Sequence, residues 1–370
     1  MRLTEIELRR LRLPLVRPFR TSFGTEVDRD ILLVRVVTDQ GTQGWGECVA
    51  GDAPLYSAEY VDGAQLVIRQ FLVERLTAVA QLTADRVAPA LAAVKGHPMA
   101  KAALEMAVLD AELRGRGLSL ADHLGAVHTR VPVGVSVGIS DSLPELMDEV
   151  ESYVGQGYRR VKLKIEPGWD VAPVQEVRTK YPDLVLQVDA NTAYTLGDAA
   201  QLAKLDAFDL LLIEQPLSED DVRGHASLAR LLRTPICLDE SITSARAAAD
   251  AIALGACSIV NIKPGRVGGY LEARRIHDVC AANGIPVWCG GMLETGLGRA
   301  ANLALAALPN FTLPGDISGS DRYWHRDLVT EPLLSDDGYM SVPTGAGVGV
   351  EVDLPWLDEL TVSVESIGAV

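Results

Sequence analysis

Five charged residues recur at nearly equal intervals along the chain. They are a lysine, three carboxylates and a second lysine, with spacings of 25, 25, 25 and 24 residues: Lys164, Asp189, Glu214, Asp239 and Lys263. Each carboxylate directly follows an apolar run, as in LVLQVD, where an unpaired charge is costly to bury. This pattern favours a functional site over a set of solvated surface charges.

The three carboxylates, Asp189, Glu214 and Asp239, predict an oxygen site for a hard cation. Mg²⁺ is the expected ion, with Mn²⁺ or Co²⁺ as substitutes. None of the six histidines lies in the apolar runs that carry the charged residues. A zinc hydrolase built on histidine ligands is therefore disfavoured.

A metal ion between two lysines suits the removal of a proton from the carbon next to a carboxylate. The ion would neutralise the enediolate as it forms, and a lysine would take the proton. At pH 7 only about one ordinary lysine in a few thousand is neutral, so the pKa of such a base has to be lowered. Lys162 shares a strand face with Lys164, and Arg266 lies three residues after Lys263. We expect their positive charges to lower the pKa of the two bases; the alternative for Lys162 is a side chain that extends to solvent.

The elements that position these residues repeat as strand, loop and helix from about residue 131. Apolar runs predict eight strands, at 131–139, 161–166, 184–191, 210–216, 235–241, 258–265, 286–294 and 311–318. Such strands, alternating with helices, are typical of a parallel sheet, and eight in a row favour a closed barrel. Chemistry gathers at the carboxyl ends of barrel strands, where the five charged residues would meet. No clear helix follows the eighth run.

The first 125 residues have a different order of elements. Strand patterns at 3–13, 30–39 and 41–50 precede helical patterns at 56–76 and 99–115. Strands followed by helices predict an α+β domain over 1–125, which leaves the barrel at 126–325. The segment 326–370 has short strand-like pieces that could pack on either domain.

Composition excludes several classes of partner. The net charge is −16, from 34 Lys and Arg against 50 Asp and Glu, which argues against nucleic acid or an anionic membrane. No apolar run reaches the roughly 18 residues of a membrane helix, and the N-terminal residues predict a strand and not a signal peptide. The five cysteines form no C-x-x-C pair. We therefore expect a soluble cytoplasmic protein with reduced thiols.

Several long motifs carry a family resemblance. KLKIEPGWD, QVDANTAY, LLLIEQPL, CLDESI, VNIKPGRVGGYLEARRIHDVC and WCGGMLETGLGRAANLALAALP resemble the enolase superfamily, in its muconate-lactonizing group with a K-x-K motif. More closely, the chain is similar to the o-succinylbenzoate synthase / N-acylamino acid (N-succinylamino acid) racemase family. The resemblance covers essentially the whole chain, including PFRTSFGT at 18–25 and GWGECVA at 44–50.

The resemblance implies an N-terminal α+β capping domain on a (β/α)₇β barrel, with the segment 326–370 returning to the cap. It implies Lys164 and Lys263 as the acid/base pair and Asp189, Glu214 and Asp239 as metal ligands. The substrate contacts that it implies are Ser136, Lys162, Asn191, Met292 and Leu293, with Phe19 and Phe23 closing the pocket from a cap loop. The two phenylalanines could equally belong to the cap core, and Met292 and Leu293 could be barrel core. Gly51 stands where some relatives carry a bulkier residue that lines the acyl pocket.

Two reactions of a small carboxylate substrate follow from the resemblance. In the synthase reaction, one lysine removes an α-proton and a hydroxyl leaves, which gives o-succinylbenzoate for menaquinone. In the racemase reaction, one lysine removes the α-proton of an N-acylamino acid and the other returns a proton on the opposite face. The alternatives are a dipeptide epimerase, a muconate cycloisomerase, a Schiff-base aldolase and, from another class, a metal-binding barrel without catalysis. The resemblance also implies a homo-oligomer.

Overall fold

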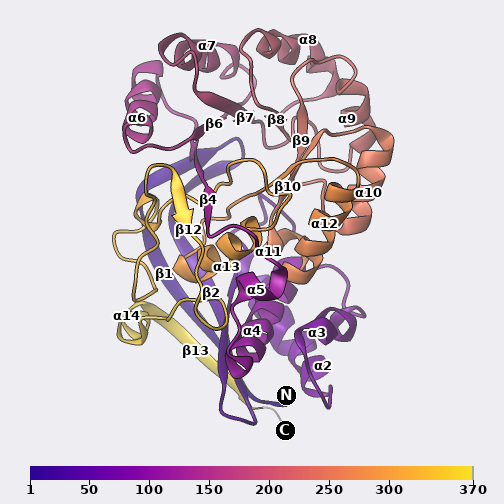
Figure 1. Ribbon diagram of the computed structural model, residues 1–370, viewed down its shortest axis with the longest axis vertical. Coiled ribbons are helices and arrows are strands. Elements are labelled where there is room, and N and C mark those ends of the chain that lie inside the picture. Colours follow the sequence, from indigo (N-terminus) through magenta and orange to yellow (C-terminus); the bar gives the residue numbers. More distant parts are fainter. Residues whose placement is uncertain (369–370) are drawn as a thin grey trace.

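The N-terminal part of the molecule is built on a four-stranded antiparallel sheet (Figure 1). The computed structural model describes residues 1–368, and the strand order in this sheet is β13, β1, β2, β3. The bounds are β1 (Leu3–Thr21), β2 (Gly24–Thr38), β3 (Gln43–Cys48) and β13 (Thr361–Gly368). Because β13 pairs with β1, the C-terminal segment returns to the cap sheet. The last two residues of the predicted segment 326–370 lie outside the described part of the chain.

The strands β1 and β2 form one long hairpin whose tip reaches the barrel. Apolar residues at every second position of β1, such as Leu11, Leu13 and Leu15, are buried, as expected for a strand with one covered face. The hairpin pairs Thr21 with Gly24, which leaves only residues 22–23 to form the tip.

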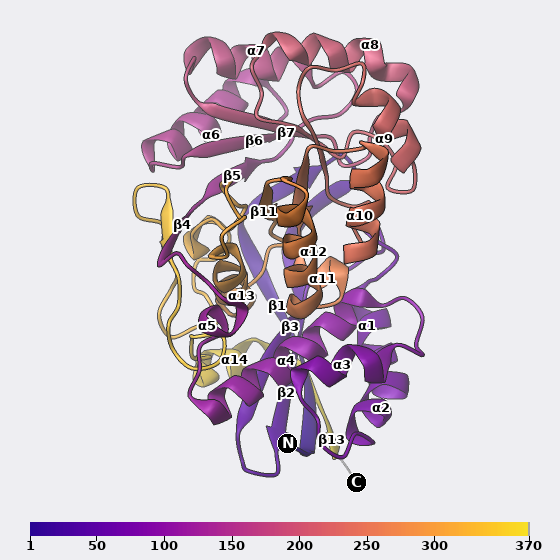
Figure 2. The same cartoon turned by 45° about the vertical axis from the view of Figure 1, so that its right-hand side comes forward.

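Helices pack against one face of the cap sheet (Figure 2). They are α1 (Val61–Val67), the π-helical turn η1 (Ile68–Leu72), α2 (Val73–Thr77), α3 (Ala84–Leu91) and α4 (Pro98–Arg116), of which α1 and α4 contact the strands directly. The next helix, α5 (Leu120–Leu124), packs against the barrel helix α13 (Gly296–Ala306). The helix predicted over 56–76 therefore begins five residues late. The reason is that Tyr60 has an extended backbone and forms a β-bridge with Gly51, so residues 56–60 belong to a loop.

Seven of the eight predicted barrel strands form a parallel sheet in their sequence order. They are β5 (Gly134–Val137), β6 (Arg160–Lys164), β7 (Val185–Asp189), β8 (Ile213–Glu214), β9 (Ile236–Leu238), β10 (Ile259–Ile262) and β11 (Val287–Cys289). A separate two-stranded sheet pairs β4 (Arg130–Pro132) with β12 (Tyr339–Ser341). With the cap sheet, these strands give the capped (β/α)₇β architecture expected from the sequence.

The eighth predicted strand, 311–318, is not a regular strand. It makes isolated parallel bridges from Phe311 to Val287 and from Gly315 to Val133, and so connects the two edges of the seven-stranded sheet. Pro314 interrupts the segment and has no N–H to give to a ladder, which accounts for the missing regular pairing. The 3₁₀-helix η4 (Ser320–Arg322) follows in place of a barrel helix.

Helices surround the barrel strands (Figures 1 and 2). They are α6 (Leu143–Gly155), α7 (Val171–Lys180), η2 (Leu196–Asp198), α8 (Ala199–Leu202), η3 (Ala203–Ala207), α9 (Val222–Leu228), α10 (Ala245–Leu254), α11 (Pro264–Val267), α12 (Tyr270–Ala282) and α13 (Gly296–Ala306). The short helix α14 (Leu354–Leu360) leads into β13. The sequence-based boundaries at residues 125 and 325 stay predictions.

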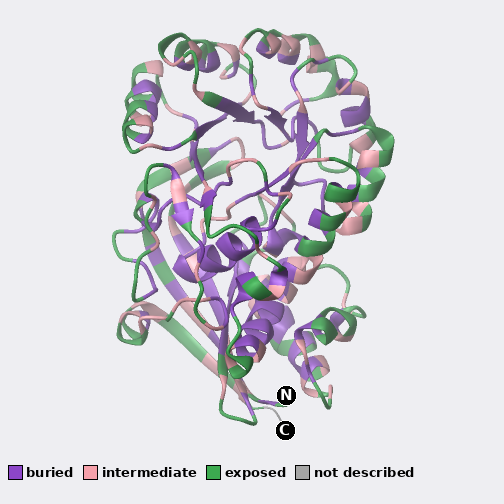
Figure 3. Cartoon of the chain, in the orientation of Figure 1, coloured by how far each residue is buried: buried purple, intermediate pink, exposed green. Residues whose placement is uncertain are grey.

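The buried residues follow the strands and the inner helix faces (Figure 3). Most barrel-strand residues are buried, whereas α6, α7, α9, α10 and α12 have exposed outer faces (Figure 3). The helix α13 is buried along its whole length, because it lies between the barrel and the cap strand β3. Among the described residues, no helix is both long and apolar enough to cross a membrane.

Candidate active site

The five regularly spaced charged residues meet at the carboxyl ends of the barrel strands. Lys164, Asp189 and Glu214 end β6, β7 and β8, and the strand register places Asp189 beside both of the others. Asp239 directly follows β9, and Lys263 follows β10 as the residue that precedes α11. None of the five is more than 8% exposed, so they form a buried polar cluster and not a set of surface charges.

Lys162 and Lys164 both bind carboxylates inside the barrel. The Nζ of Lys164 donates to Asp189 Oδ2 (2.7 Å) and to Asn191 Oδ1 (2.6 Å). The Nζ of Lys162 lies 2.9 Å from Glu214 Oε2, 3.1 Å from Asp189 Oδ2 and 2.5 Å from Asp316 Oδ2. Lys162 is only 2% exposed, so the alternative of a solvent-directed side chain is wrong.

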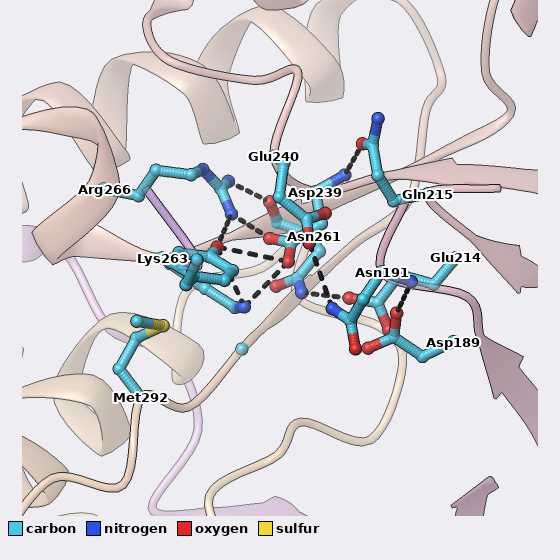
Figure 4. A network of polar contacts seen from close by, with 12 residues as sticks. Asp189, Asn191, Glu214, Gln215, Asp239, Glu240, Asn261, Lys263, Arg266 and Met292 are labelled. Atoms are coloured by element: carbon cyan, nitrogen blue, oxygen red, sulfur yellow. Dashed lines mark hydrogen bonds and ion pairs between the residues drawn. The ribbon is translucent and has the colours of Figure 1, made fainter. Parts of the chain in front are cut away.

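Lys263 belongs to a second group of contacts around Asp239 (Figure 4). Its Nζ donates to Asp239 Oδ2 at 2.7 Å, while the Arg266 guanidinium binds the other oxygen of the same carboxylate (Figure 4). Arg266 also donates to the backbone oxygens of Ile242 (2.9 Å) and Asn261 (2.7 Å). Arg266 is therefore fixed beside Asp239, and the carboxylate of Asp239 lies between the guanidinium of Arg266 and the Nζ of Lys263.

The surroundings shift the pKa values of the two lysines in opposite directions. Burial lowers the pKa of Lys164, and the charge of Lys162 lowers it further, against the opposing effect of Asp189. Burial also disfavours the charged form of Lys263, but nearby groups, Tyr56 and carboxylates such as Glu240, outweigh it and raise its pKa. The direction for Lys164 agrees with the expectation, and the direction for Lys263 is opposite to it. The tuning roles of Lys162 and Arg266 stay predictions.

The carboxylates at the strand ends have the right chemistry for a hard cation. Asp189, Glu214 and Asp239 are almost fully buried and offer only oxygen donors. In the described residues, however, no group of three or more His, Cys, Asp or Glu side chains is arranged so that it could hold a metal ion. Ammonium and guanidinium groups contact these carboxylates instead. The three carboxylates fit a divalent ion by their chemistry, because they offer buried oxygen donors. A bound ion would compete with the lysine and arginine groups for the same oxygens. The metal-ligand roles stay predictions.

A cavity of about 270 Å³ lies between this cluster and the cap. Both Lys164 and Lys263 line it. So do all the side chains expected to contact substrate: Ser136, Lys162, Asn191, Met292, Leu293, Phe19 and Phe23. The two phenylalanines reach it from the β1–β2 hairpin, where Ser22 Oγ donates to the backbone oxygen of Asn191 (3.3 Å). The cavity is therefore formed jointly by the cap and the barrel.

The cavity lining also includes polar residues that were not predicted from the sequence, among them Tyr56, Asp316, Arg29 and Tyr323. Asp316 follows the eighth apolar run just as the other acids follow theirs, so the same rule would have found it. Gly51 also lines the cavity, and a Cβ there would lie 3.7 Å from Arg29 Nη1. A bulkier residue at position 51 would therefore reduce the space beside Arg29.

A parallel barrel with a lysine pair and three carboxylates at one mouth, closed by an α+β cap, defines a class of enzymes that take a proton from a carboxylate substrate. Residues 4–125 match the family described as mandelate racemase / muconate lactonizing enzyme, N-terminal domain, and residues 145–356 match enolase C-terminal domain-like. The chain belongs to the enolase superfamily, whose shared chemistry is proton abstraction assisted by a divalent metal ion.

Named relatives are similar to this chain over 96–100% of its length. An N-succinylamino acid racemase from an Amycolatopsis species is 64% identical over 100% of both chains. An o-succinylbenzoate synthase from Geobacillus kaustophilus is 48% identical and covers 96% of this chain and 94% of its own. A solved structure of an enolase superfamily member from Listeria innocua has a TM-score of 0.96 at 41% identity, over 100% of both chains.

Proposed function

We propose that this chain is a racemase of N-acylamino acids, with N-succinylamino acids as its preferred class, and that it uses Mg²⁺. The observation that carries the proposal is that Lys164 and Lys263 line one cavity from separate strands. A substrate held between them can lose its α-proton to one lysine and receive a proton from the other. The name of the relative at 64% identity supports the choice of substrate class.

Each residue of the cluster has a role in this proposal. Lys164 and Lys263 exchange the α-proton on opposite faces of the substrate. Asp189, Glu214 and Asp239 would hold Mg²⁺, for which Mn²⁺ or Co²⁺ could substitute. When bound, the ion supplies positive charge that neutralises the substrate carboxylate as the proton leaves. The cap closes the cavity and keeps bulk water from the carbon that has lost its proton.

A second candidate function is o-succinylbenzoate synthase, a step toward menaquinone. It is supported by the synthase relative at 48% identity and by the lysine pair itself. The synthase needs one lysine to remove the proton and a cation opposite to it while the hydroxyl leaves. Dipeptide epimerase and muconate cycloisomerase, which by the family resemblance share the lysine pair and the three carboxylates, stay alternatives, so the choice among them requires substrates.

We also propose that the protein acts in the cytoplasm as a homo-oligomer on small carboxylates. Its five cysteines are all buried, which suits a reducing compartment. Its net charge of −16 disfavours nucleic acid and anionic membranes as partners. Light scattering of the purified protein measures the number of subunits directly.

The test is proton NMR of N-succinyl-phenylalanine in D₂O, with Mg²⁺ and then with EDTA. We expect metal-dependent loss of the α-proton signal together with racemisation. Lys164→Ala and Lys263→Ala should each abolish racemisation, and Lys180→Ala, at an exposed lysine of α7, should have no effect. A folded, metal-loaded protein that exchanges no α-proton would exclude the racemase, and the synthase substrate, dipeptides and muconate would then be assayed in turn.

A further inference from the structure

Tyr56 brings a phenol group from the cap to one of the two lysines. It lies in the loop between β3 and α1, and its ring packs beside Phe23 with the ring centroids 6.1 Å apart. Its hydroxyl accepts a hydrogen bond from Lys263 Nζ (3.1 Å) and donates one to Asp239 Oδ2 (3.3 Å). Lys263 Nζ also lies 4.6 Å from the centroid of the Tyr56 ring. One cap side chain thus touches the reacting group of Lys263 with both its hydroxyl and its ring.

Lys164 is held differently. Within the described residues, its two recorded hydrogen bonds go to Asp189 and Asn191, which both belong to the barrel. The Asn191 side chain is fixed in turn by a hydrogen bond to Glu240 Oε1, at 3.0 Å (Figure 4). The barrel alone therefore orients one lysine, whereas the cap and the barrel together orient the other.

The chemistry of the phenol suits a lysine that changes its protonation state. A carboxylate only accepts hydrogen bonds, so it favours the ammonium form. The Tyr56 hydroxyl can accept from the ammonium of Lys263 and can donate to its neutral amine. It can therefore contact the end of the flexible four-carbon side chain as acceptor or as donor, whereas Asp239 can only accept and binds the neutral amine more weakly than the ammonium.

We propose that Tyr56 is a positioning residue for Lys263, and that the cap loop thereby prepares one face of the substrate for proton transfer and not the other. The inference rests on the proposed function, because it requires the two lysines to act on opposite faces. Tyr56 is then the residue through which the cap takes part in the chemistry, in addition to closing the cavity. The alternative is that Tyr56 is simply part of the cavity wall.

Single-lysine backgrounds separate these two possibilities. The Lys164→Ala protein keeps only Lys263, and the Lys263→Ala protein keeps only Lys164. Each should exchange the α-proton of only one enantiomer of N-succinyl-phenylalanine in D₂O with Mg²⁺. We expect Tyr56→Phe, which keeps the ring, to slow exchange about tenfold or more in the Lys164→Ala background, the loss typical of a hydrogen bond to a charged group. In the Lys263→Ala background we expect less than about a twofold change, because Lys164 has no contact with the phenol.

The same experiment contains its controls. Tyr60→Phe changes the last residue of the same loop and should leave both exchange rates unaltered. Equal losses from Tyr56→Phe in both backgrounds would overturn the proposal. A contact with the cavity wall, or an effect on the metal through Asp239, would slow proton exchange by Lys164 as much as by Lys263. No loss in either background would overturn it as well. If neither single-lysine protein exchanges an α-proton although both are folded and metal-loaded, the two-lysine function itself fails, and this inference fails with it.

Discussion

The buried carboxylate of Glu47 links the cap to the barrel and should make the stability of the protein depend on pH. It lies at the end of β3 and accepts hydrogen bonds from Thr295 N (2.9 Å), Thr295 Oγ1 (2.7 Å) and Gly298 N (3.0 Å) at the start of α13. These donors favour the charged form, but burial outweighs them, and the charge of Glu294 adds to the effect of burial. Together they raise the pKa of Glu47 to about 7.

The direction of the effect follows from this shift. The pKa of Glu47 is about 7 in the folded protein and about 4.5 in the unfolded chain, so the folded state holds the proton more tightly between these values. The stabilisation is complete below pH 4.5 and is lost as the pH rises through 7. At about 1.4 kcal/mol for each pKa unit, the loss is on the order of 3 kcal/mol. Gln at this position does not titrate, so a Glu47→Gln protein should lack this part of the pH dependence.

Urea unfolding between pH 5 and 8 measures the effect. The difference in unfolding free energy between the unmodified protein and Glu47→Gln should move by about 2 to 3 kcal/mol in favour of the variant as the pH rises. Glu105 and Glu240, whose pKa values are also raised to about 7, are common to both proteins and cancel. Glu359→Gln, at an exposed position of α14, is the control for loss of a surface charge. A difference that is flat across this range would refute the reasoning and would mean that the three hydrogen bonds outweigh burial.

Two further predictions concern close packing and buried charge. Gly46→Ala should lower the free energy of unfolding by about 1–3 kcal/mol or more, because a Cβ at position 46 would lie 2.0 Å from a backbone oxygen of α4. Gly155→Ala, at the end of α6 with open space around it, should be neutral or up to about 1 kcal/mol stabilising. Thermal melts of both variants measure the difference, and equal stability of the two would contradict the tight contact at Gly46. Arg160→Met removes one of the two cationic partners of Asp316, from a buried pair at 2.5 Å, and should cost about 3 kcal/mol. The half-exposed Arg159→Met should cost less than about 1 kcal/mol, and urea midpoints that rank these two in the reverse order would refute the assignment.

The sequence predicted that the five charged residues lie together, because the place of each one follows from the repeating order of strand and helix along the chain. Each repeat of strand and helix puts the residue after the strand at the same mouth of the barrel, so regular spacing was enough to bring Lys164 and Lys263 to one cavity. Asp316 lies in the eighth apolar run, so the same rule could have placed it at this mouth, but the rule does not predict what Asp316 contacts there. Its importance comes from contacts with Arg160 and Lys162, and pairings over more than 150 residues cannot be read from spacing.

Tyr56 could not be predicted from the sequence for a different reason. The apolar pattern over 56–76 is continuous, and helical periodicity alone assigned Tyr56 to a helix. The helix starts later because the backbone of Tyr60 pairs with Gly51, a contact between two parts of the loop. The direction of the Tyr56 side chain then depends on how the cap sits on the barrel, which no local pattern encodes.

The cap is anchored most firmly on the side of the barrel that carries Lys263. Glu47 binds the start of α13, and Glu105 on α4 accepts hydrogen bonds from Tyr270 N (2.6 Å) and Leu271 N (2.9 Å) at the start of α12. These helices follow β11 and β10, next to Lys263. On the side of Lys164, the cap reaches the barrel through the tip of the β1–β2 hairpin, whose nearby Val27 is 58% exposed. The Tyr56 contact thus lies where buried carboxylates fix the cap against the barrel, and Phe23 at the hairpin tip packs beside the Tyr56 ring, so both parts of the cap contribute to the orientation of Lys263.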